Sequence, residues 1–333
     1  MADDTDQEAD TKFVTANGIR MAYREHGNAD DPVLMLVAGI YNQLIRWPDE
    51  LIDLLVERGF RVIRFDNRDI GLTEKMAGQK APSVIRITMK LLFGVPVNVP
   101  YSLDDMAKDT VGLMDSLEID KAHIVGMSMG GMIAQLVTIL FPERVLSLTS
   151  IMSTTGAFGK GKASLQVARQ MVAPIPKNRT ALENSVITRQ MFGSPAYPQT
   201  DAEVTASVAE EFKRSSNPAG YLRQMAAVRL APSRNEQLKK VIVPTLIIHG
   251  NQDLLVNISG GVETKKCIGH AKFVRFEGMG HNLPRVLLPK FADLIKDIAC
   301  FFVSSVRLNI FIISSQIVSE ISSPISTFVV IIF

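Results

Sequence analysis

The sequence is poor in cysteine and has almost no excess of charge. Its two cysteines, Cys267 and Cys300, do not match the spacing of a metal site. Reduced thiols in a cytoplasmic protein are the expectation for such sparse cysteine. The 36 basic and 34 acidic side chains leave a formal net charge of +2, so no basic surface for nucleic acid or an anionic membrane is predicted. We therefore expect neither a metal ion nor a nucleic-acid partner.

The two ends of the chain differ in composition from the rest. Acidic residues crowd the first ten positions, the opposite of a secretory signal or a transit peptide, and residues 1–12 are predicted to be disordered. Residues 299–333 form a hydrophobic tail rich in Ile, Val, Phe and Ser. Within this tail, Arg307 and Glu320 leave no run of about 18 uncharged residues that could span a membrane. The tail is predicted to be an appendage without a catalytic role, with weak membrane association as the alternative.

Between these ends, short β-branched runs alternate with amphipathic stretches. The 333 residues, 47% of them hydrophobic, suffice for one large α/β domain with an insertion. Strands are predicted at residues 13–23 (a hairpin turning at Asn17-Gly18), 32–37, 60–65, 122–125, 145–152, 241–249 and 271–276, and helices at 48–58, 103–117, 132–140 and 289–298. This alternation predicts a mainly parallel sheet with helices on both faces.

Residues 153–235 interrupt the alternation. They lack a clear buried strand, are rich in helical pattern and contain several prolines. We predict that they form a helical cap, inserted between two strands of a core that comprises residues 13–152 and 236–298. Nothing in the sequence indicates an oligomeric state.

The pattern Gly126-x-Ser128-x-Gly130 lies between a predicted strand and a predicted helix. This context is typical of a nucleophile elbow, a strained strand-to-helix turn that exposes a serine Oγ at a helix N-terminus. Glycine is needed two positions to either side because the turn brings neighbouring backbone too close for a Cβ. Ser128 is therefore the candidate nucleophile.

A serine nucleophile needs a base within hydrogen-bond reach and a carboxylate that orients the base. His281 follows the last core strand in a Gly-Met-Gly-His loop, at the edge where chemistry collects in parallel sheets. The other histidines, His26, His123, His249 and His270, are interpreted as core or surface residues. Residues 147–180 contain no Asp or Glu, which leaves Asp253, after the strand at 241–249, as the acid. Glu277 is interpreted as an anchor of its own loop.

Two backbone N–H groups are expected to stabilise the developing oxyanion. Met129, directly after the nucleophile, supplies one from the helix N-terminus. Ile40, which follows Gly39 in the loop after the strand at 32–37, supplies the other. Gly39 and Trp47 are candidate pocket residues, and packing of Trp47 in the core is the alternative for this only tryptophan.

Asp66 and Arg68 follow the strand predicted at residues 60–65. A functional interpretation would have Arg68 clamp a carboxylate of the substrate. The structural interpretation, which we favour, is that the two residues fix a loop at the carboxyl edge of the sheet.

Three segments together resemble the α/β-hydrolase superfamily, over residues 13–298. They are Asn42-Gln-Leu-Ile-Arg-Trp47-Pro-Asp-Glu, Arg64-Phe-Asp66-Asn-Arg68-Asp-Ile-Gly71 and Val125-Gly-Met-Ser128-Met-Gly-Gly131. They are similar to the esterase branch that contains aclacinomycin methylesterase. The resemblance implies the α/β-hydrolase fold and a Ser128–Asp253–His281 triad. Many members of the superfamily have His-Gly where this chain has Ala38-Gly39.

These observations predict a serine hydrolase without a cofactor, which cleaves small to medium apolar carboxylic esters through an acyl-enzyme intermediate. Three alternatives stay open. A proline-iminopeptidase-like amide hydrolase would need an acidic group in the cap to hold a free amine. A cofactor-free perhydrolase of the haloperoxidase type would differ mainly in the oxyanion loop. A non-catalytic binding protein with this fold would commonly lack one of the three triad residues.

Overall fold

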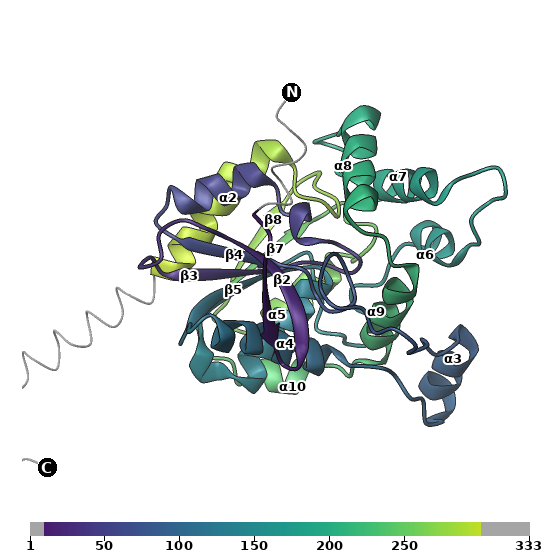
Figure 1. Cartoon of the computed structure of the whole chain (residues 1–333), viewed down its shortest axis with the longest axis horizontal. Coiled ribbons are helices and arrows are strands. Elements are labelled where there is room, and N and C mark those ends of the chain that lie inside the picture. Colours follow the sequence, from purple (N-terminus) through teal and green to yellow (C-terminus); the bar gives the residue numbers. More distant parts are fainter. Residues whose placement is uncertain (1–9, 301–333) are drawn as a thin grey trace, which may run out of the picture.

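The computed structural model describes residues 10–300, and an eight-stranded sheet forms the centre of this part of the chain (Figure 1). In spatial order the strands are β1 (Lys12–Ala16), β2 (Ile19–His26), β4 (Arg61–Phe65), β3 (Val33–Val37), β5 (Ala122–Met127), β6 (Val145–Ile151), β7 (Thr245–Gly250) and β8 (Lys272–Phe276). β2 pairs antiparallel with β1 and with β4, and the other neighbours pair in parallel. The predicted mainly parallel α/β architecture is confirmed.

The burial of the strands follows from their positions in the sheet. β3, β5 and β7 are buried at every residue, as expected for central strands that are covered on both faces. The predicted hairpin is present, and its turn residues Asn17 and Gly18 both have the positive φ that a two-residue turn of this type requires. β7 begins at Thr245 rather than at Val241, because Pro244 has no N–H to donate to a ladder.

Helices cover both faces of the sheet (Figure 1). On one face, α4 (Leu103–Ser116), α5 (Met129–Leu140), α10 (Asn235–Leu238) and α11 (Ser259–Cys267) pack over a core that includes Met35 and Ile124. On the other face, α2 (Asp49–Val56) and a helix over residues 288–300 pack over Leu36 and Val125. Successive strand residues point to opposite faces, so Met35 and Leu36 belong to different cores.

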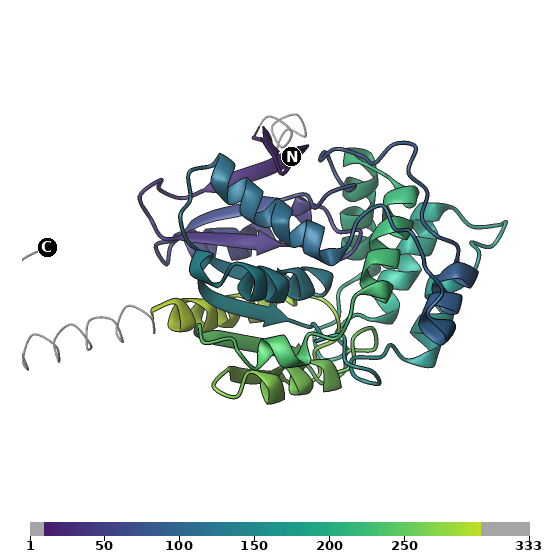
Figure 2. The same cartoon turned by 90° about the horizontal axis from the view of Figure 1, so that it is seen from below.

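A further group of helices lies together at one end of the sheet (Figures 1 and 2). It comprises α3 (Val84–Phe93), α6 (Leu165–Val172), α7 (Ala181–Met191), α8 (Asp201–Arg214) and α9 (Pro218–Leu230). No element was predicted for the segment that forms α3. Its ends are nevertheless well defined, because the Ser83 side chain accepts the N–H of Arg86 and Gly94 adopts a left-handed conformation.

The predictions for the two ends of the chain fall mostly outside the described residues. Residues 1–9 and 301–333 are not described, so the disorder of the N-terminus and the role of the tail stay predictions. The helix over 288–300 extends into the segment predicted as tail, and its residue Ala299 is buried in the same core as α2. None of the helices within residues 10–300 is long and apolar enough to cross a membrane.

Candidate active site

Ser128 forms the turn between β5 and α5. Its φ of 55° and ψ of −120° are rare for a residue with a Cβ and indicate backbone strain. The flanking glycines make the turn sterically possible. A Cβ on Gly126 would lie 2.1 Å from the carbonyl oxygen of Gly130, and one on Gly130 would lie 2.0 Å from that of Val37. The sharp strand-to-helix turn predicted from the glycine pattern is therefore present.

Asp253 and His281 lie beside Ser128, although they are distant from it in the sequence. His281 Nε2 is 2.9 Å from Ser128 Oγ, and His281 Nδ1 is 2.6 Å from Asp253 Oδ2. Asp253 follows β7 and His281 follows β8, so both loops leave the same carboxyl edge of the parallel sheet as the turn after β5. The structure brings the three side chains selected from the sequence into one chain of hydrogen bonds.

The carboxylate of Asp253 is held in one orientation. Its Oδ1 accepts the N–H groups of Leu255 and Val256, at 2.9 and 2.8 Å, and its Oδ2 faces His281. Burial acts to raise the pKa of Asp253, but the neighbouring His281 and His249 outweigh burial and lower this pKa to about 2. An ionised Asp253 accepts the Nδ1 proton of His281, which leaves Nε2 free to accept a proton from Ser128.

The end of α7 contacts the loop that carries His281. The N–H of His281 donates to the carbonyl oxygen of Phe192 at 2.7 Å, and the Phe192 ring meets the imidazole edge-on with centroids 5.9 Å apart. The N–H of Gly280 donates to Ser194 Oγ at 2.8 Å, and a Cβ on Gly280 would lie 2.0 Å from the Gly193 carbonyl oxygen. The position of His281 therefore depends on the segment that follows α7.

Glu277 and the other histidines have partners away from Ser128. Glu277 is exposed, pairs with Arg275 at 2.6 Å and accepts a hydrogen bond from the Asn251 amide, as an anchor of its own loop would. His123 contacts the Ser147 hydroxyl, His270 the Val243 carbonyl and His26 the Arg64 guanidinium. His249 lies behind the acid: its Nε2 is 2.7 Å from the Val256 carbonyl oxygen and 3.5 Å from Asp253 Oδ2.

The N–H groups of Ile40 and Met129 lie on the two segments that border Ser128. Met129 is the first residue of α5. Ile40 follows Gly39, where an added Cβ would lie 3.3 Å from the Cβ of Ser128. Within residues 10–300, neither N–H group donates a hydrogen bond to a protein acceptor, so both are available to a bound molecule.

A cavity of about 810 Å³ opens beside Ser128 and His281 and is lined by the loop after β3, by α7 and by α8. This volume is in the range of ordinary small-molecule sites. Trp47 lies outside the cavity, fully buried in the core beneath α2, which is the alternative that the sequence left open. Gly39 does not line the cavity but borders Ser128. No group of three or more His, Cys, Asp or Glu side chains within the described residues could hold a metal ion.

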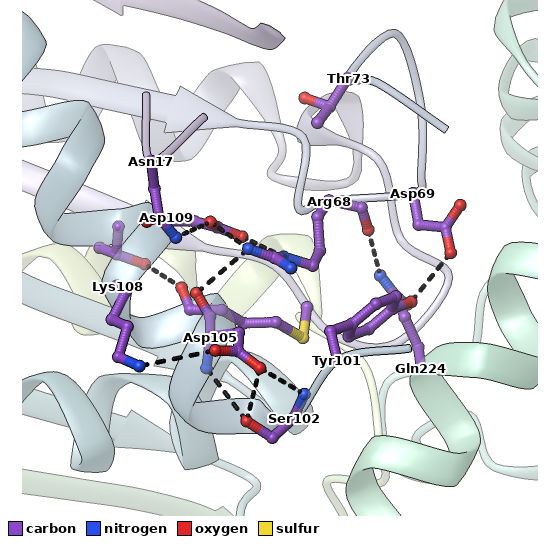
Figure 3. Close-up of polar contacts among 12 residues, drawn as sticks. Asn17, Arg68, Asp69, Thr73, Tyr101, Ser102, Asp105, Lys108, Asp109 and Gln224 are labelled. Carbon is purple, nitrogen blue, oxygen red and sulfur yellow. Dashed lines mark hydrogen bonds and ion pairs between the residues drawn. The ribbon is translucent and has the colours of Figure 1, made fainter. Parts of the chain in front are cut away.

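Asp66 and Arg68 both fix loops, but they do not pair with each other. Arg68 donates through Nε and Nη2 to the two carboxylate oxygens of Asp109, each at 2.5 Å (Figure 3). Asp66 accepts the N–H of Leu44 at 2.7 Å and pairs with Arg214 at 2.7 Å. These contacts agree with the structural interpretation and leave Arg68 outside the cavity.

The next residue, Asp69, connects the loop after β4 to α9. Its carboxylate pairs with Arg223 of α9, whose Nη2 donates to Oδ1 at 2.7 Å. It also accepts the hydroxyl of Tyr101 at 3.0 Å (Figure 3). Burial acts to raise the pKa of Asp69, but the hydrogen bond from Arg223 contributes to a net lowering. In the same region Gln224 donates to the Arg68 carbonyl oxygen at 3.1 Å. α9 is therefore attached to the core by buried polar contacts.

Several residues that line the cavity were not predicted from the sequence. Arg46 comes from the loop after β3, Arg189 from α7, and Phe192 from the segment after α7. Arg46 lies in residues 42–50, one of the three segments that resemble the α/β-hydrolase superfamily, although no role was predicted for it. The α7 residues carry no local signal, because helical periodicity does not tell which face of an inserted helix meets a cavity.

The comparisons with known proteins identify the fold family of this chain. Residues 32–284 match the family model for the alpha/beta hydrolase fold. Rhodomycin D methylesterase of Streptomyces peucetius is 26% identical, with 82% of this chain and 93% of the relative covered. A putative non-heme bromoperoxidase of Mycobacterium tuberculosis is 31% identical, with 79% of this chain and 91% of the relative covered. The enol-lactonase structure from Burkholderia xenovorans superposes with a TM-score of 0.65 at 22% identity, over 88% of this chain and 100% of the enol-lactonase. The chain belongs to the α/β-hydrolase fold family.

Proposed function

We propose that this protein is a serine hydrolase that cleaves carboxylic esters, with Ser128, His281 and Asp253 as its catalytic triad. The observation that carries the proposal is the unbroken hydrogen-bonded chain from Ser128 Oγ through both nitrogens of His281 to Asp253. A serine at a strained turn, a base in contact with it and an ionised acid behind the base are the parts that acyl transfer needs.

The reaction would proceed in two halves. Ser128 Oγ attacks the ester carbonyl while His281 Nε2 takes the hydroxyl proton, and the collapsing intermediate expels the alcohol, which receives that proton. Water, deprotonated by His281, then attacks the acyl-enzyme and releases the acid and the free serine. The N–H groups of Ile40 and Met129 would stabilise the oxyanion in both halves, and loss of one such donor typically costs on the order of a hundredfold or more in rate.

The substrate would enter between two parts of the chain. We assign residues 13–152 and 236–298 as the hydrolase core and residues 153–235 as its cap, since the cavity has lining residues from both. The rhodomycin D methylesterase relative supports a methyl ester of a polycyclic natural product as one candidate substrate. This part of the proposal rests on similarity, because one fold serves many substrates.

A fluorophosphonate probe tests the nucleophile directly. We expect intact-mass measurement of the folded protein to show one adduct, and Ser128→Ala to abolish it. Ser185→Ala is the matched control, because Ser185 also lines the cavity but donates its hydroxyl to the carbonyl of Ala181 in its own helix. Absence of an adduct on the folded protein, or an adduct that survives in Ser128→Ala, would contradict the proposal.

A cofactor-free perhydrolase is a second candidate, favoured by the 31% identity to the putative non-heme bromoperoxidase. In this reaction hydrogen peroxide replaces water, attacks the acyl-enzyme and leaves as the peroxy acid, while Ser128 regains its proton. Ester turnover with and without hydrogen peroxide, with the peroxy acid measured directly, separates the two candidates. Formation of the free acid alone in both reactions would exclude the perhydrolase.

A further inference from the structure

Arg46 places a cation on the wall of the cavity that contains Ser128. It is the last residue of the short helix Leu44–Arg46, in the loop that also carries Ile40. Its side chain is partly buried, and the one hydrogen bond that this side chain makes within residues 10–300 is from Nη1 to Ser207 Oγ, at 3.2 Å. No carboxylate of the described residues forms an ion pair with it.

A second cation lies against the same hydroxyl. Arg189 Nη1 donates to Ser207 Oγ at 3.3 Å, while its Nη2 donates to Glu211 Oε2 at 2.7 Å. The other oxygen of Glu211, Oε1, is buried and accepts no hydrogen bond within the described residues. Glu211 is therefore the carboxylate near both guanidinium groups, and it forms an ion pair only with Arg189.

The other charged side chains that line the cavity do not neutralise Arg46. Asp49 pairs with Arg64 at 2.6 Å, and Glu50 pairs with Arg285 at 3.4 Å. The carboxylate of Glu203 accepts hydrogen bonds from Thr200 at the start of α8, where its side chain is exposed. Neither Glu203 nor Glu210 is among the charges that act on the guanidinium of Arg46. The charges that act on Arg46 are those of Arg189 and Glu211, so two guanidinium groups face one carboxylate in this region.

Two effects make the charged form of Arg46 poorly stabilised. Burial and the positive charge of Arg189 lower the pKa of Arg46 to about 10, although Glu211 acts in the opposite direction. The guanidinium is still protonated near neutral pH. It lacks both full hydration and a carboxylate partner, so an anion that enters the cavity would stabilise it.

We propose that Arg46 forms an anion-binding end of the ester cavity, so that the preferred substrate is an ester that also carries a free carboxylate. The proposal rests on ester hydrolysis at Ser128. A planar guanidinium matches the two oxygens of a carboxylate, and Ser207 holds that guanidinium in place. In a half-ester of a dicarboxylic acid, the free carboxylate contacts Arg46 while the ester carbonyl reaches Ser128.

A series of paired substrates tests this assignment. Each monomethyl ester of a dicarboxylic acid, with chains of about four to ten carbons, is compared with the analogue in which a primary amide replaces the free carboxyl group. The ratio of the two kcat/KM values cancels general losses of activity. We expect wild type to prefer the half-ester at one range of lengths. Arg46→Gln should reduce that preference on the order of tenfold to a hundredfold, the usual contribution of a hydrogen bond to a charged group.

Arg285→Gln is the matched control for the loss of positive charge. Arg285 lines the same cavity but is exposed and pairs with Glu50, so this variant should keep the wild-type ratio. A wild-type ratio near one at every chain length, or an equal loss of preference in Arg46→Gln and Arg285→Gln, would overturn the role of Arg46.

A binding measurement separates failure of this inference from failure of the proposed function. The half-esters and their amide analogues are titrated calorimetrically into Ser128→Ala and into the double variant Ser128→Ala/Arg46→Gln. Neither variant is expected to turn over the ligand. Tighter binding of half-esters than of their amides, lost with Arg46→Gln, would support the anion site even if wild type hydrolysed no ester. Equal binding of both ligands in the presence of Arg46 would refute the site, even if Ser128 proved to be the nucleophile.

Discussion

Replacement of Asp253 by Asn probes how His281 is held. The side-chain orientation is determined by the structure, because Oδ1 accepts two backbone N–H groups, from Leu255 and Val256. In Asp253→Asn the amide oxygen keeps those two hydrogen bonds, and the amide NH₂ group takes the place of Oδ2 opposite His281 Nδ1. That group can only donate, so His281 must accept at Nδ1 and carry its proton on Nε2. The imidazole then presents a proton to Ser128 Oγ instead of a lone pair.

The expected loss is large because this change removes the lone pair with which the proposed base acts on Ser128, without moving the histidine. A wrong tautomer of this kind lowers kcat about 10⁴-fold in a serine protease triad. At about 1.36 kcal/mol for each factor of ten, this corresponds to about 5 kcal/mol of transition-state free energy. Labelling by a fluorophosphonate should slow in parallel, since it needs the same activation of Ser128.

The assay is kcat for an activated ester, together with the free energy of unfolding from urea titration. Glu277→Gln is the matched control, because it makes the same acid-to-amide change at the carboxylate that follows β8, which pairs with Arg275. We expect this control to stay within about twofold of wild-type kcat. A loss below about tenfold in a folded Asp253→Asn protein would refute the proposed role of Asp253.

Three further predictions concern stability. Gly126→Ala places a Cβ 2.1 Å from a carbonyl oxygen and should lower the free energy of unfolding by about 3 kcal/mol, whereas Gly269→Ala, with open space around the site, should change it by less than about 0.5 kcal/mol. Arg68→Met leaves Asp109 buried without its cation and should cost about 3–5 kcal/mol, while KM for esters stays unchanged; a selective rise in KM would instead support the clamp interpretation. Burial lowers the pKa of His123 from 6.5 to about 4, so the unfolded state binds the proton more readily. Stability should therefore fall by about 3 kcal/mol as the pH drops through this interval, and urea titrations of His123→Asn should lack that part of the pH dependence.

The residues of the proposed triad could be selected from the sequence because each obeys a local rule. Ser128 lies between two glycines at a strand-to-helix boundary, and His281 follows the last strand. Asp253 remained after a long segment without acidic residues had excluded an earlier position. The parallel sheet then needed only to align the ends of its strands for these loops to meet.

The partner of Arg68 could not be predicted in this way. Asp109 lies in α4, where an acidic residue in an amphipathic pattern indicates a solvent-facing position, yet it is only 2% exposed. Its burial depends on how α4 packs against the loop after β4, which is a tertiary contact between distant segments. The pairing of Asp69 with Arg223 was hidden for the same reason.

No element was predicted for the segment that forms α3. Its residues Ile85, Leu92 and Phe93 are 75%, 68% and 70% exposed, and nothing local in the sequence indicates that large apolar side chains lie at the surface here. Ser83 and Gly94 are typical residues for the two ends of a helix. They indicate helix ends only once the residues between them are assigned to a helix. Cavity-lining residues such as Arg46 were missed because their role depends on where α7 and α8 lie.

The backbone contact between Phe192 and His281 joins the wall of the cavity to the proposed catalytic base. Helices α7 and α8 supply much of the cavity wall, and changes to their side chains would alter which molecules fit. The junction from Phe192 to Ser194 has no such freedom, because it also sets the height and tilt of the imidazole. During divergence toward new substrates, amino-acid replacements should therefore accumulate along these helices and be scarce at the junction. A specificity-altering library is best directed at α7 and α8, with residues 192–194 held constant.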